Sequence, residues 1–271
     1  MTTSILIIAG SDSCAGAGMQ IDLKTAAAHG VYATCALTAV TAQNTTEVTA
    51  IQPVDPEIVQ AQVEAVFADI APRAVKVGML GTKEVAEAVA DTLSLHRDVP
   101  VVLDPVLVAT AGGELTSAEA FDAIRDCLIP RATVVTPNLP EARALTGADP
   151  SDITGIGTCA NRFLNMGADA VLIKGGHGTE DTIYDRLYMA SGMRKMSSKR
   201  LKGEFHGTGC SLSTAIACNL ARGFSLEESV LAAHDYLADA LSHELALGGG
   251  SKMCASIWKA TRSATPPKPA L

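Results

Sequence analysis

The sequence predicts an α/β fold in which helices cover both faces of a mainly parallel sheet. Short runs of β-branched and aliphatic residues alternate along the chain with amphipathic stretches of helical period, the order typical of parallel strands joined by helices. The runs are apolar throughout rather than at every second position, so both faces of the sheet are expected to be buried. Aromatic residues make up only 4% of the chain, so small aliphatic side chains must fill the core.

Six segments in the first two thirds of the chain carry the strand pattern. They occupy residues 4–10, 33–40, 74–80, 99–106, 132–138 and 169–176. Helices are predicted between them over residues 55–70, 82–96 and 116–129 because apolar positions recur with the helical period. The first of these begins with Asp55 as a cap and Pro56 at the first helical position, where a proline loses no hydrogen bond.

The last third of the chain has a different pattern. Residues 181–205 alternate polar and apolar side chains, which predicts an antiparallel hairpin or edge extension with a solvated basic run, MRKMSSKRLK. Two helices are expected over residues 208–222 and 226–246. The chain shows no internal repeat and no interdomain linker. We therefore expect one domain over residues 1–262 and a Pro-rich, disordered tail over residues 263–271.

Composition excludes several classes of protein. The net charge is −8, with 29 acidic and 21 basic residues, which argues against a nucleic-acid partner because phosphate binding needs clustered Lys and Arg. Seven cysteines without a CxxC pair, in a chain whose first apolar run is too short for an export signal, indicate reduced thiols and a cytoplasmic location. No uncharged stretch is long enough to span a membrane.

Polar residues that can bind a ligand stand at the ends of several predicted strands. Asp104 lies at the end of one strand, Asn138 and Glu141 follow the next, and Lys174 follows a third. Ligands of open α/β sheets bind at the carboxyl ends of the strands. Asp104 is either a capping or turn residue or a ligand of Mg²⁺, and Glu141 either belongs to the same site or serves only the positive end of a helix. Their common position favours a shared site.

Two further loops contain candidate ligand-binding residues. The stretch AGSDSCAGAGMQIDLKT follows the first strand, with glycines that permit a tight turn and Asp22 in the first turn of the next helix. It is either a plain strand–helix turn or a ligand loop, and it lacks the dinucleotide fingerprint. Gln43 and Asn44 follow the second strand as ordinary turn residues or as amides that pair with a heterocycle.

The stretch HGTGC, followed by an apolar helix, carries the strongest chemical signal. Gly207 and Gly209 allow backbone amides to approach an anion closely, and the positive end of the helix points to the same place, which suits a phosphoryl group in transfer. In that field we expect the pKa of Cys210 to be lowered, giving a thiolate near neutral pH. The alternative, a small buried cysteine, suits Cys218 better. The P-loop motif is absent, which excludes that class of kinase.

Taken together, these motifs resemble those of the ribokinase-like superfamily and, within it, the hydroxymethylpyrimidine/phosphomethylpyrimidine kinases of thiamine biosynthesis. The similar stretches are IAGSD, GAGMQIDLKT, TAVTAQNT, VKVGMLG, VVLDPV, TPNLPEA, VLIKGGH and HGTGCSLSTAIA, in family order from residue 8 to about residue 222. The resemblance implies a three-layer α/β/α sandwich with a small antiparallel edge, ATP as phosphoryl donor, Mg²⁺ as cofactor, and a homodimer.

The resemblance also implies a role for each candidate residue. The anion hole would consist of Gly207, Thr208, Gly209 and Cys210, with Cys210 as the base that accepts the proton of the acceptor hydroxyl. Lys174 would contact the ATP phosphates. Asn138, Glu141 and Thr208 would also bind the nucleotide, and Asp104 and Glu141 the metal. The pyrimidine pocket would be formed by Gly10, Asp22, Gln43, Met79 and Val106.

The sequence departs from the family pattern in four places. At the expected flap over the active site, ATAGGEL stands where the family commonly has an AKSGD-like run. The first loop reads SDSCAGAG where the family often has SDPSGGAG, so Ser13, Cys14 and Ala15 stand beside the pocket in place of Pro, Ser and Gly. The approach to the anion hole reads EFHGTGC rather than NTHGTGC. LGGGSKMCASIW lacks the usual glycine–proline–histidine pattern near the carboxyl terminus. None of these departures touches the catalytic residues.

Other functions remain possible from the sequence. A pyridoxal kinase of the same branch would also phosphorylate a hydroxymethyl group on a nitrogen heterocycle. Gln43 favours the pyrimidine, because an amide pairs with both its ring nitrogen and its amino group. A non-catalytic ligand sensor would not need Lys174, Asp104 and Cys210 together. A NAD-dependent dehydrogenase would need the missing dinucleotide fingerprint.

Overall fold

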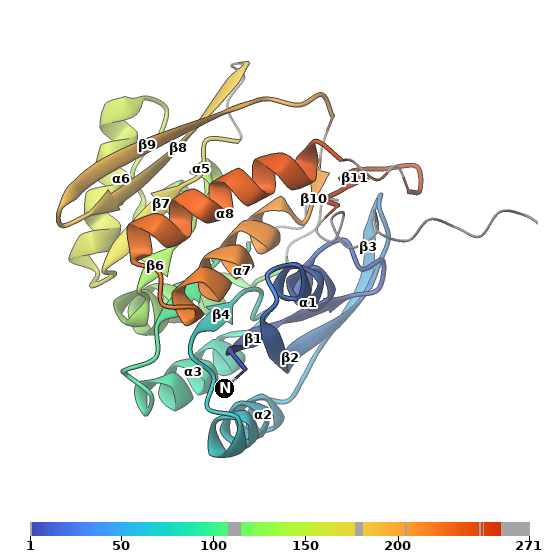
Figure 1. Ribbon diagram of the computed structural model, residues 1–271. Helices are drawn as coiled ribbons and strands as arrows, with labels where there is room; N and C mark the ends of the chain where they lie inside the picture. The colour runs from blue at the N-terminus through green and yellow to red at the C-terminus, as the bar shows by residue number, and fades with distance from the viewer. Residues whose placement is uncertain are drawn as a thin grey trace, which may run out of the picture.

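A nine-stranded sheet organises the protein, which we describe from a computed structural model over residues 2–107, 115–176, 181–203, 205–243, 245 and 247–255. The strand order is β3-β2-β1-β4-β5-β6-β7-β8-β9 (Figure 1). The six inner strands from β2 to β7 run parallel, and β3, β8 and β9 add antiparallel edges. The strands are β1 (Ser4–Asp12), β2 (Tyr32–Gln43), β3 (Val48–Pro53), β4 (Val75–Val77), β5 (Val101–Leu103), β6 (Val134–Val135), β7 (Ala170–Ile173), β8 (Thr182–Met189) and β9 (Gly192–Lys199).

Helices cover both faces of this sheet, which confirms the three-layer α/β/α prediction (Figure 1). One layer contains α1 (Gly18–Ala28), α7 (Thr208–Ala221) and α8 (Leu226–Leu241). The other contains α2 (Pro56–Asp69), α3 (Lys83–Ser94), α4 (Ala118–Ala123), α5 (Leu139–Thr146) and α6 (Ile153–Asn165). Two short strands, β10 (Phe205–His206) and β11 (Lys252–Met253), pair with each other in a separate two-stranded sheet.

The central strand β1 shows why the strands are apolar throughout. Ile5 and Ile7 pack into the core beneath α1, α7 and α8, whereas Leu6 and Ile8 pack into the core on the opposite face. All four side chains have 0% exposure. A strand whose successive side chains point to opposite faces can be apolar throughout only when both faces are covered.

The predicted elements are present with revised boundaries. The stretch 116–129 is not one α-helix: α4 ends at Ala123 and continues as a π-helical turn, Ile124–Leu128, and a 3₁₀ turn, Ile129–Arg131. Pro130 explains the change, since its ring cannot continue an α-helix. The last two helices end at residues 221 and 241 rather than 222 and 246. Strand β3 and helix α6 were not predicted, and the expected tail over 263–271 lies outside the described residues.

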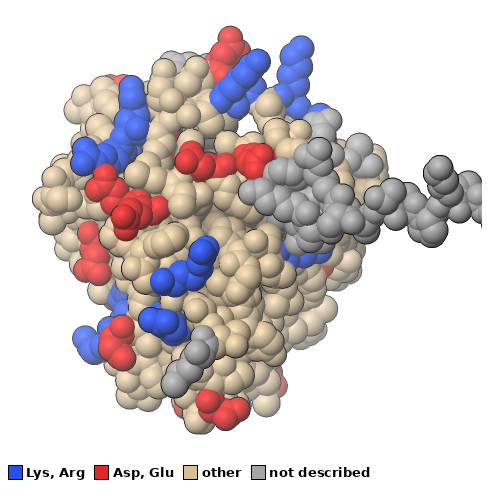
Figure 2. All heavy atoms as spheres, viewed as in Figure 1, with Lys and Arg blue, Asp and Glu red and all other residues tan. Residues whose placement is uncertain are grey.

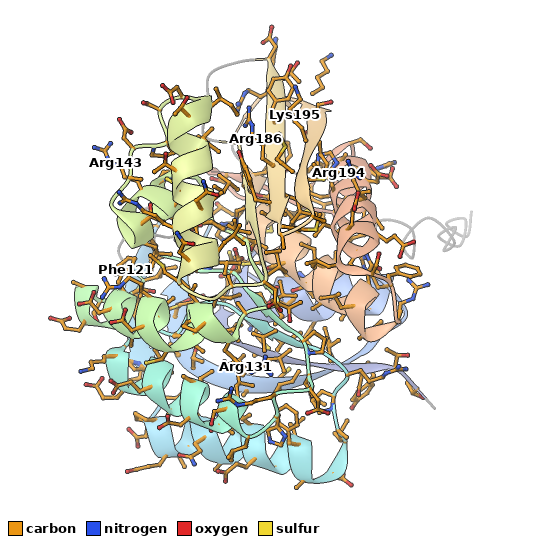
Figure 3. The ribbon with its side chains drawn as sticks, turned by 90° about the vertical axis from the view of Figure 1, so that its left-hand side faces the viewer. Phe121, Arg131, Arg143, Arg186, Arg194 and Lys195 are labelled. Carbon is orange, nitrogen blue, oxygen red and sulfur yellow. The ribbon has the colours of Figure 1, made fainter. Side chains whose placement is uncertain are left out.

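The basic run forms the outer strand of an antiparallel hairpin, as predicted, with β9 at the edge of the sheet. Figure 3 shows Arg186 on β8, and Arg194 and Lys195 on β9, the two strands of this hairpin. Arg194 forms an ion pair with Glu227 at the start of α8, and Lys195 lies 4.5 Å above the ring of Tyr184. Arg194 therefore links the hairpin to α8, and Lys195 contacts the other strand of the hairpin.

The surface in view carries both signs of charge. In Figure 2, the Lys and Arg side chains are interspersed with Asp and Glu over most of the visible face. Within the described part of the chain, every helix falls short of the length and apolar character needed to cross a membrane.

Candidate active site

An ion pair between a partly buried lysine and a buried carboxylate lies at the carboxyl ends of β5 and β7. Lys174, directly after β7, places its Nζ 3.0 Å from Oδ1 of Asp104, directly after β5. Thr136 donates to the same oxygen at 3.0 Å, and Ser213 of α7 donates to Oδ2 at 3.2 Å. Asp104 is only 1% exposed. The structure thus brings together two residues predicted from different strand ends and adds two hydroxyl groups that fix the carboxylate.

The charges in this cluster shift each other's pKa. Burial raises the pKa of the Asp104 carboxyl, but Lys174 and the nearby Lys76 outweigh it, so the pKa is lowered overall. Burial lowers the pKa of Lys174, and the carboxylates of Asp104 and Glu141 outweigh that effect and raise it. At neutral pH the pair is therefore ionised.

Asn138 and Glu141 form a capping box at the start of α5. Asn138 accepts a hydrogen bond from the Glu141 amide at 2.8 Å, and Glu141 accepts one from the Asn138 amide at 2.7 Å. The structural role considered for Glu141 is therefore real. Its carboxyl is also 6% exposed, and burial together with Asp104 raises its pKa to about 7 against the opposing charge of Lys174.

The HGTGC stretch forms the start of α7 as predicted. Gly207 is the N-cap with φ of +77°, and a Cβ there would lie 1.9 Å from the Gly16 carbonyl oxygen, so only glycine fits. The first hydrogen bond within the helix runs from the Ser211 amide to Gly207. The backbone amides of Thr208, Gly209 and Cys210 come before Ser211 in the chain, so they lie in the first turn of α7, at its positive end.

Gly209 brings this helix end against the ion pair. A Cβ on Gly209 would lie 3.0 Å from Nζ of Lys174 and 3.6 Å from Oδ2 of Asp104. The absence of a side chain therefore lets the α7 backbone approach both charged groups. The residues predicted to form the anion hole and the lysine predicted to bind phosphate are therefore neighbours.

The expected thiolate at Cys210 is not found. Burial raises the pKa of this thiol to about 12; Lys76 opposes the shift, and Asp22 and Asp104 add to it. The two carboxylates and the loss of solvent outweigh the helix end, so Cys210 is a thiol at neutral pH. Cys218, on the same helix, has 0% exposure and is the structural cysteine that its pattern suggested.

A second ion pair, between Lys76 and Asp22, was not predicted. Nζ of Lys76 in β4 lies 2.6 Å from Oδ2 of Asp22, and both side chains have 0% exposure. Thr214 of α7 donates to Oδ1 at 2.8 Å. Asp22 lies in the second turn of α1, because the helix begins at Gly18 rather than nearer to Asp22. The available signal was a charged residue inside the short apolar strand AVKVGML.

The other predicted pocket residues lie near the ends of the central strands. Sδ of Met79 is 2.8 Å from the position that a Cβ on Gly10 would take, so these two residues are in contact. Val106 is partly exposed just after β5. Gln43, at the end of β2, contacts His206 through its amide nitrogen and Thr41 through its amide oxygen. Asn44 forms an ordinary turn by accepting from the Thr46 and Glu47 amides.

A glycine-rich helix start, a partly buried lysine and a buried carboxylate meet at the carboxyl edge of a parallel sheet. These features define a small-molecule phosphotransferase of the ribokinase-like fold. The structure of an ADP complex of Bacillus subtilis pyridoxal kinase is similar, with a TM-score of 0.88 and 32% sequence identity over 97% of this chain and 99% of that chain.

Sequence comparison identifies the family within this class. The family model for phosphomethylpyrimidine kinase matches residues 12–255, and the chain belongs to that family. It is 46% identical over 244 residues to the hydroxymethylpyrimidine/phosphomethylpyrimidine kinase of Rhizobium meliloti, covering 89% of this chain and 91% of that protein. It is also 43% identical to the thiamine biosynthesis bifunctional protein ThiED of Geobacter sulfurreducens, covering 91% of this chain and 51% of that protein.

Proposed function

We propose that the protein transfers the γ-phosphoryl group of ATP to hydroxymethylpyrimidine and then to the resulting monophosphate, giving the pyrophosphate for thiamine biosynthesis. The observation that carries the proposal is that Lys174, Asp104 and the backbone amides at the start of α7 lie together. The chain is also 46% identical to a hydroxymethylpyrimidine/phosphomethylpyrimidine kinase. Lys174 and the amides at residues 207–210 would bind the transferring phosphoryl group, whose charge is spread over its outer oxygens.

Mg²⁺ fits the carboxylates at this edge. Asp104 and Glu141 are buried carboxylates at the carboxyl edge of the sheet, and carboxylate oxygens are ligands that Mg²⁺ accepts. Asp104 and Glu141 would hold the ion, directly or through its waters, and Asn138 and Thr208 would contact the nucleotide. When bound, Mg²⁺ neutralises charge on the phosphates.

Cys210 is proposed as the group that accepts the acceptor's hydroxyl proton in the first reaction. The second acceptor is a phosphate that is already ionised, so a base matters less there. Because the thiol is protonated at neutral pH in the ligand-free protein, its proton must leave before it can act, and Lys76 is the nearby charge that favours that loss. The first reaction should therefore depend on Cys210 far more than the second.

The Cys210→Ala variant tests this assignment, with Cys127→Ala as control because Cys127 is an exposed thiol elsewhere. Loss of a general base costs roughly 100-fold to 10,000-fold in rate. We expect a loss of that size in the first reaction and less than about tenfold in the second, with both rates unchanged in the control. Equal losses in the two reactions would rule out a base role for Cys210.

Pyrimidine is favoured over pyridoxal as the acceptor. The curated relatives named as pyrimidine kinases reach 46% identity, whereas the pyridoxal kinase of similar structure is 32% identical. Gly10, Met79, Val106, Gln43 and Asp22 would form the pocket. In the ligand-free structure Asp22 is fully enclosed by Lys76 and Thr214, so we propose that it shapes the pocket through those partners.

The assembly and location of the protein remain proposals. We propose a homodimer in the cytoplasm, based on the family resemblance and on the reduced state expected of seven cysteines without a CxxC pair. The molar mass of the purified protein from light scattering tests the dimer directly. A monomer over the whole working concentration range would contradict it.

A further inference from the structure

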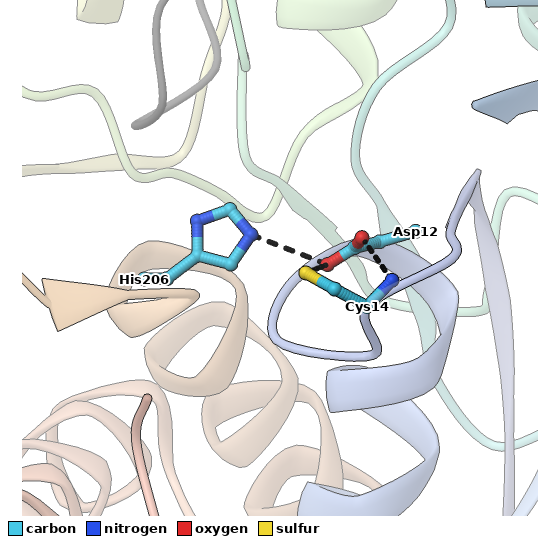
Figure 4. Close-up of side chains that lie close together, drawn as sticks. All are labelled: Asp12, Cys14 and His206. Atoms are coloured by element: carbon cyan, nitrogen blue, oxygen red, sulfur yellow. Dashed lines mark hydrogen bonds and ion pairs between the residues drawn. The ribbon is translucent and has the colours of Figure 1, made fainter. Parts of the chain in front are cut away.

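Three side chains that the phosphoryl-transfer site does not use gather beside it. Asp12 ends β1, Cys14 lies in the loop that follows, and His206 ends β10 immediately before the N-cap of α7 (Figure 4). Oδ2 of Asp12 is 3.3 Å from Sγ of Cys14 and 3.2 Å from Nε2 of His206. Asp12 and His206 are each 2% exposed. One ligand atom from each residue lies within 4.8 Å of the others.

The donor set and its spacing match a thiophilic divalent cation. Bond lengths to Zn²⁺ of about 2.0–2.3 Å at tetrahedral angles place nitrogen and oxygen ligands about 3.4 Å apart, and sulfur and oxygen ligands about 3.6 Å apart. The corresponding distances here are 3.2 and 3.3 Å, so a small outward movement admits the ion. Thiolate and imidazole ligands select Zn²⁺ over Mg²⁺, which prefers oxygen.

The carboxylate of Asp12 is already held in place. Its Oδ2 accepts hydrogen bonds from the amides of Gly16 and Ala17 at 2.9 and 2.8 Å, and its Oδ1 accepts one from the Cys14 amide at 2.9 Å. Such outer hydrogen bonds orient a ligand and strengthen metal binding. The loop therefore presents an ionised, fixed oxygen to the two neighbouring donors.

The hydrogen bonds of His206 are mutually exclusive without a cation. Nε2 lies 3.0 Å from the amide nitrogen of Gln43, a donor, and 3.2 Å from the carboxylate of Asp12, an acceptor. One ring nitrogen either accepts or donates, so it serves only one of these neighbours. Nδ1 is buried, and among the described residues it has no hydrogen-bond partner to fix the tautomer, so the ring can carry its hydrogen there and leave the Nε2 lone pair for a metal.

We propose that Asp12, Cys14 and His206 form a Zn²⁺ site, with the fourth position taken by water. Binding releases the Cys14 proton to solvent and forms a sulfur–zinc bond, while His206 binds as the neutral ring and Asp12 as the carboxylate. The site joins the loop after β1 to the residue that precedes the anion hole.

Cobalt substitution tests the proposal on the full-length protein. Metal-free protein is titrated with Co²⁺, whose bond to a thiolate gives a near-ultraviolet charge-transfer band, and Zn²⁺ affinity is then measured by competition and calorimetry. We expect one Co²⁺ per chain with that band, displaced by Zn²⁺, and release of about one proton per Zn²⁺ at neutral pH. Mg²⁺ at millimolar concentration should not displace it.

Three variants locate the metal. Cys14→Ser should abolish the charge-transfer band and weaken Zn²⁺ binding by at least about 100-fold, more than the loss of an outer-shell partner costs. His206→Asn should weaken it similarly, and Cys127→Ser, at an exposed thiol, should leave both unchanged. Thermal unfolding of each variant shows whether it is folded. No thiolate band in the wild type, or a band that survives Cys14→Ser and disappears in Cys210→Ser, would overturn the proposal.

Discussion

The buried pair of Lys76 and Asp22 makes the folding stability of this protein sensitive to a single charge. Replacing Lys76 by Met keeps most of the side-chain volume but leaves the Asp22 carboxylate with only Thr214 as a partner. Breaking a fully buried ion pair by removing one member costs about 3–5 kcal/mol, because the remaining charge is neither solvated nor paired. We expect a loss of that size at about pH 8, measured by urea unfolding.

The pH dependence of this loss follows from the carboxyl group. Burial raises the pKa of Asp22 even beside Lys76, and without the lysine the pKa must rise further. A carboxyl whose folded-state pKa exceeds its unfolded value contributes stability that is fully present below the unfolded pKa and is lost as the pH rises through the folded pKa. The penalty of Lys76→Met should therefore be smaller at lower pH, where Asp22 takes up a proton, than at about pH 8.

Two variants complete the experiment. In Lys76→Met/Asp22→Asn both charges are gone, so the double variant should be more stable at about pH 8 than Lys76→Met alone, with a coupling of about 1–3 kcal/mol. Lys83→Met is the matched control, because Lys83 pairs with Glu87 on the surface and should contribute at most about 0.5 kcal/mol. A cost for Lys76→Met no larger than that of the control would refute the reasoning about the buried pair.

Three further predictions concern the start of α7 and the helices around it. Gly207→Ala should abolish both phosphorylations and destabilise the fold by more than about 2 kcal/mol. The left-handed backbone alone costs a non-glycine residue up to about 2 kcal/mol, and the new Cβ would also clash with the Gly16 carbonyl oxygen. Activity above a tenth of wild type would contradict this prediction. Gly157→Ala lies mid-helix in α6 with open space around it and should instead raise the unfolding free energy by about 0.5–1 kcal/mol in urea. Because the pKa of Cys210 is about 12, the fraction of thiolate rises with pH, and the ratio of the first to the second reaction rate should rise between about pH 7 and 9, approaching tenfold per pH unit. In Cys210→Ala this ratio should not change with pH. A ratio independent of pH in the wild type would show that thiolate formation does not limit the first reaction.

The sequence was most informative about the layers and the strand ends. Continuous apolar runs identified the inner strands, and Asp104 and Lys174, 70 residues apart in the chain, were placed in one site because both follow such runs. The glycines of HGTGC were assigned to the helix start for a local reason, since the backbone there needs a positive φ and a close approach. Signals of this kind depend on neighbouring residues or on strand position, and a single sequence contains both.

What the sequence could not give depends on contacts between distant segments. The pKa of Cys210 was predicted in the wrong direction because the helix end is visible in the sequence, whereas the buried carboxylates of Asp22 and Asp104 around the thiol are visible only in three dimensions. The Lys76–Asp22 pair joins residues 54 positions apart, and the His206–Asp12 contact joins residues 194 positions apart. Neither spacing follows a helical or strand period.

Product analysis of the purified protein is the most direct test of its function. The protein is incubated with MgATP and hydroxymethylpyrimidine, and in parallel with MgATP and pyridoxal, and the products are followed over time by mass spectrometry. We expect a pyrimidine monophosphate that appears first and is then converted to the pyrophosphate, with less turnover of pyridoxal. A pyridoxal phosphate peak without any pyrimidine product would contradict it, and so would the absence of product from either acceptor.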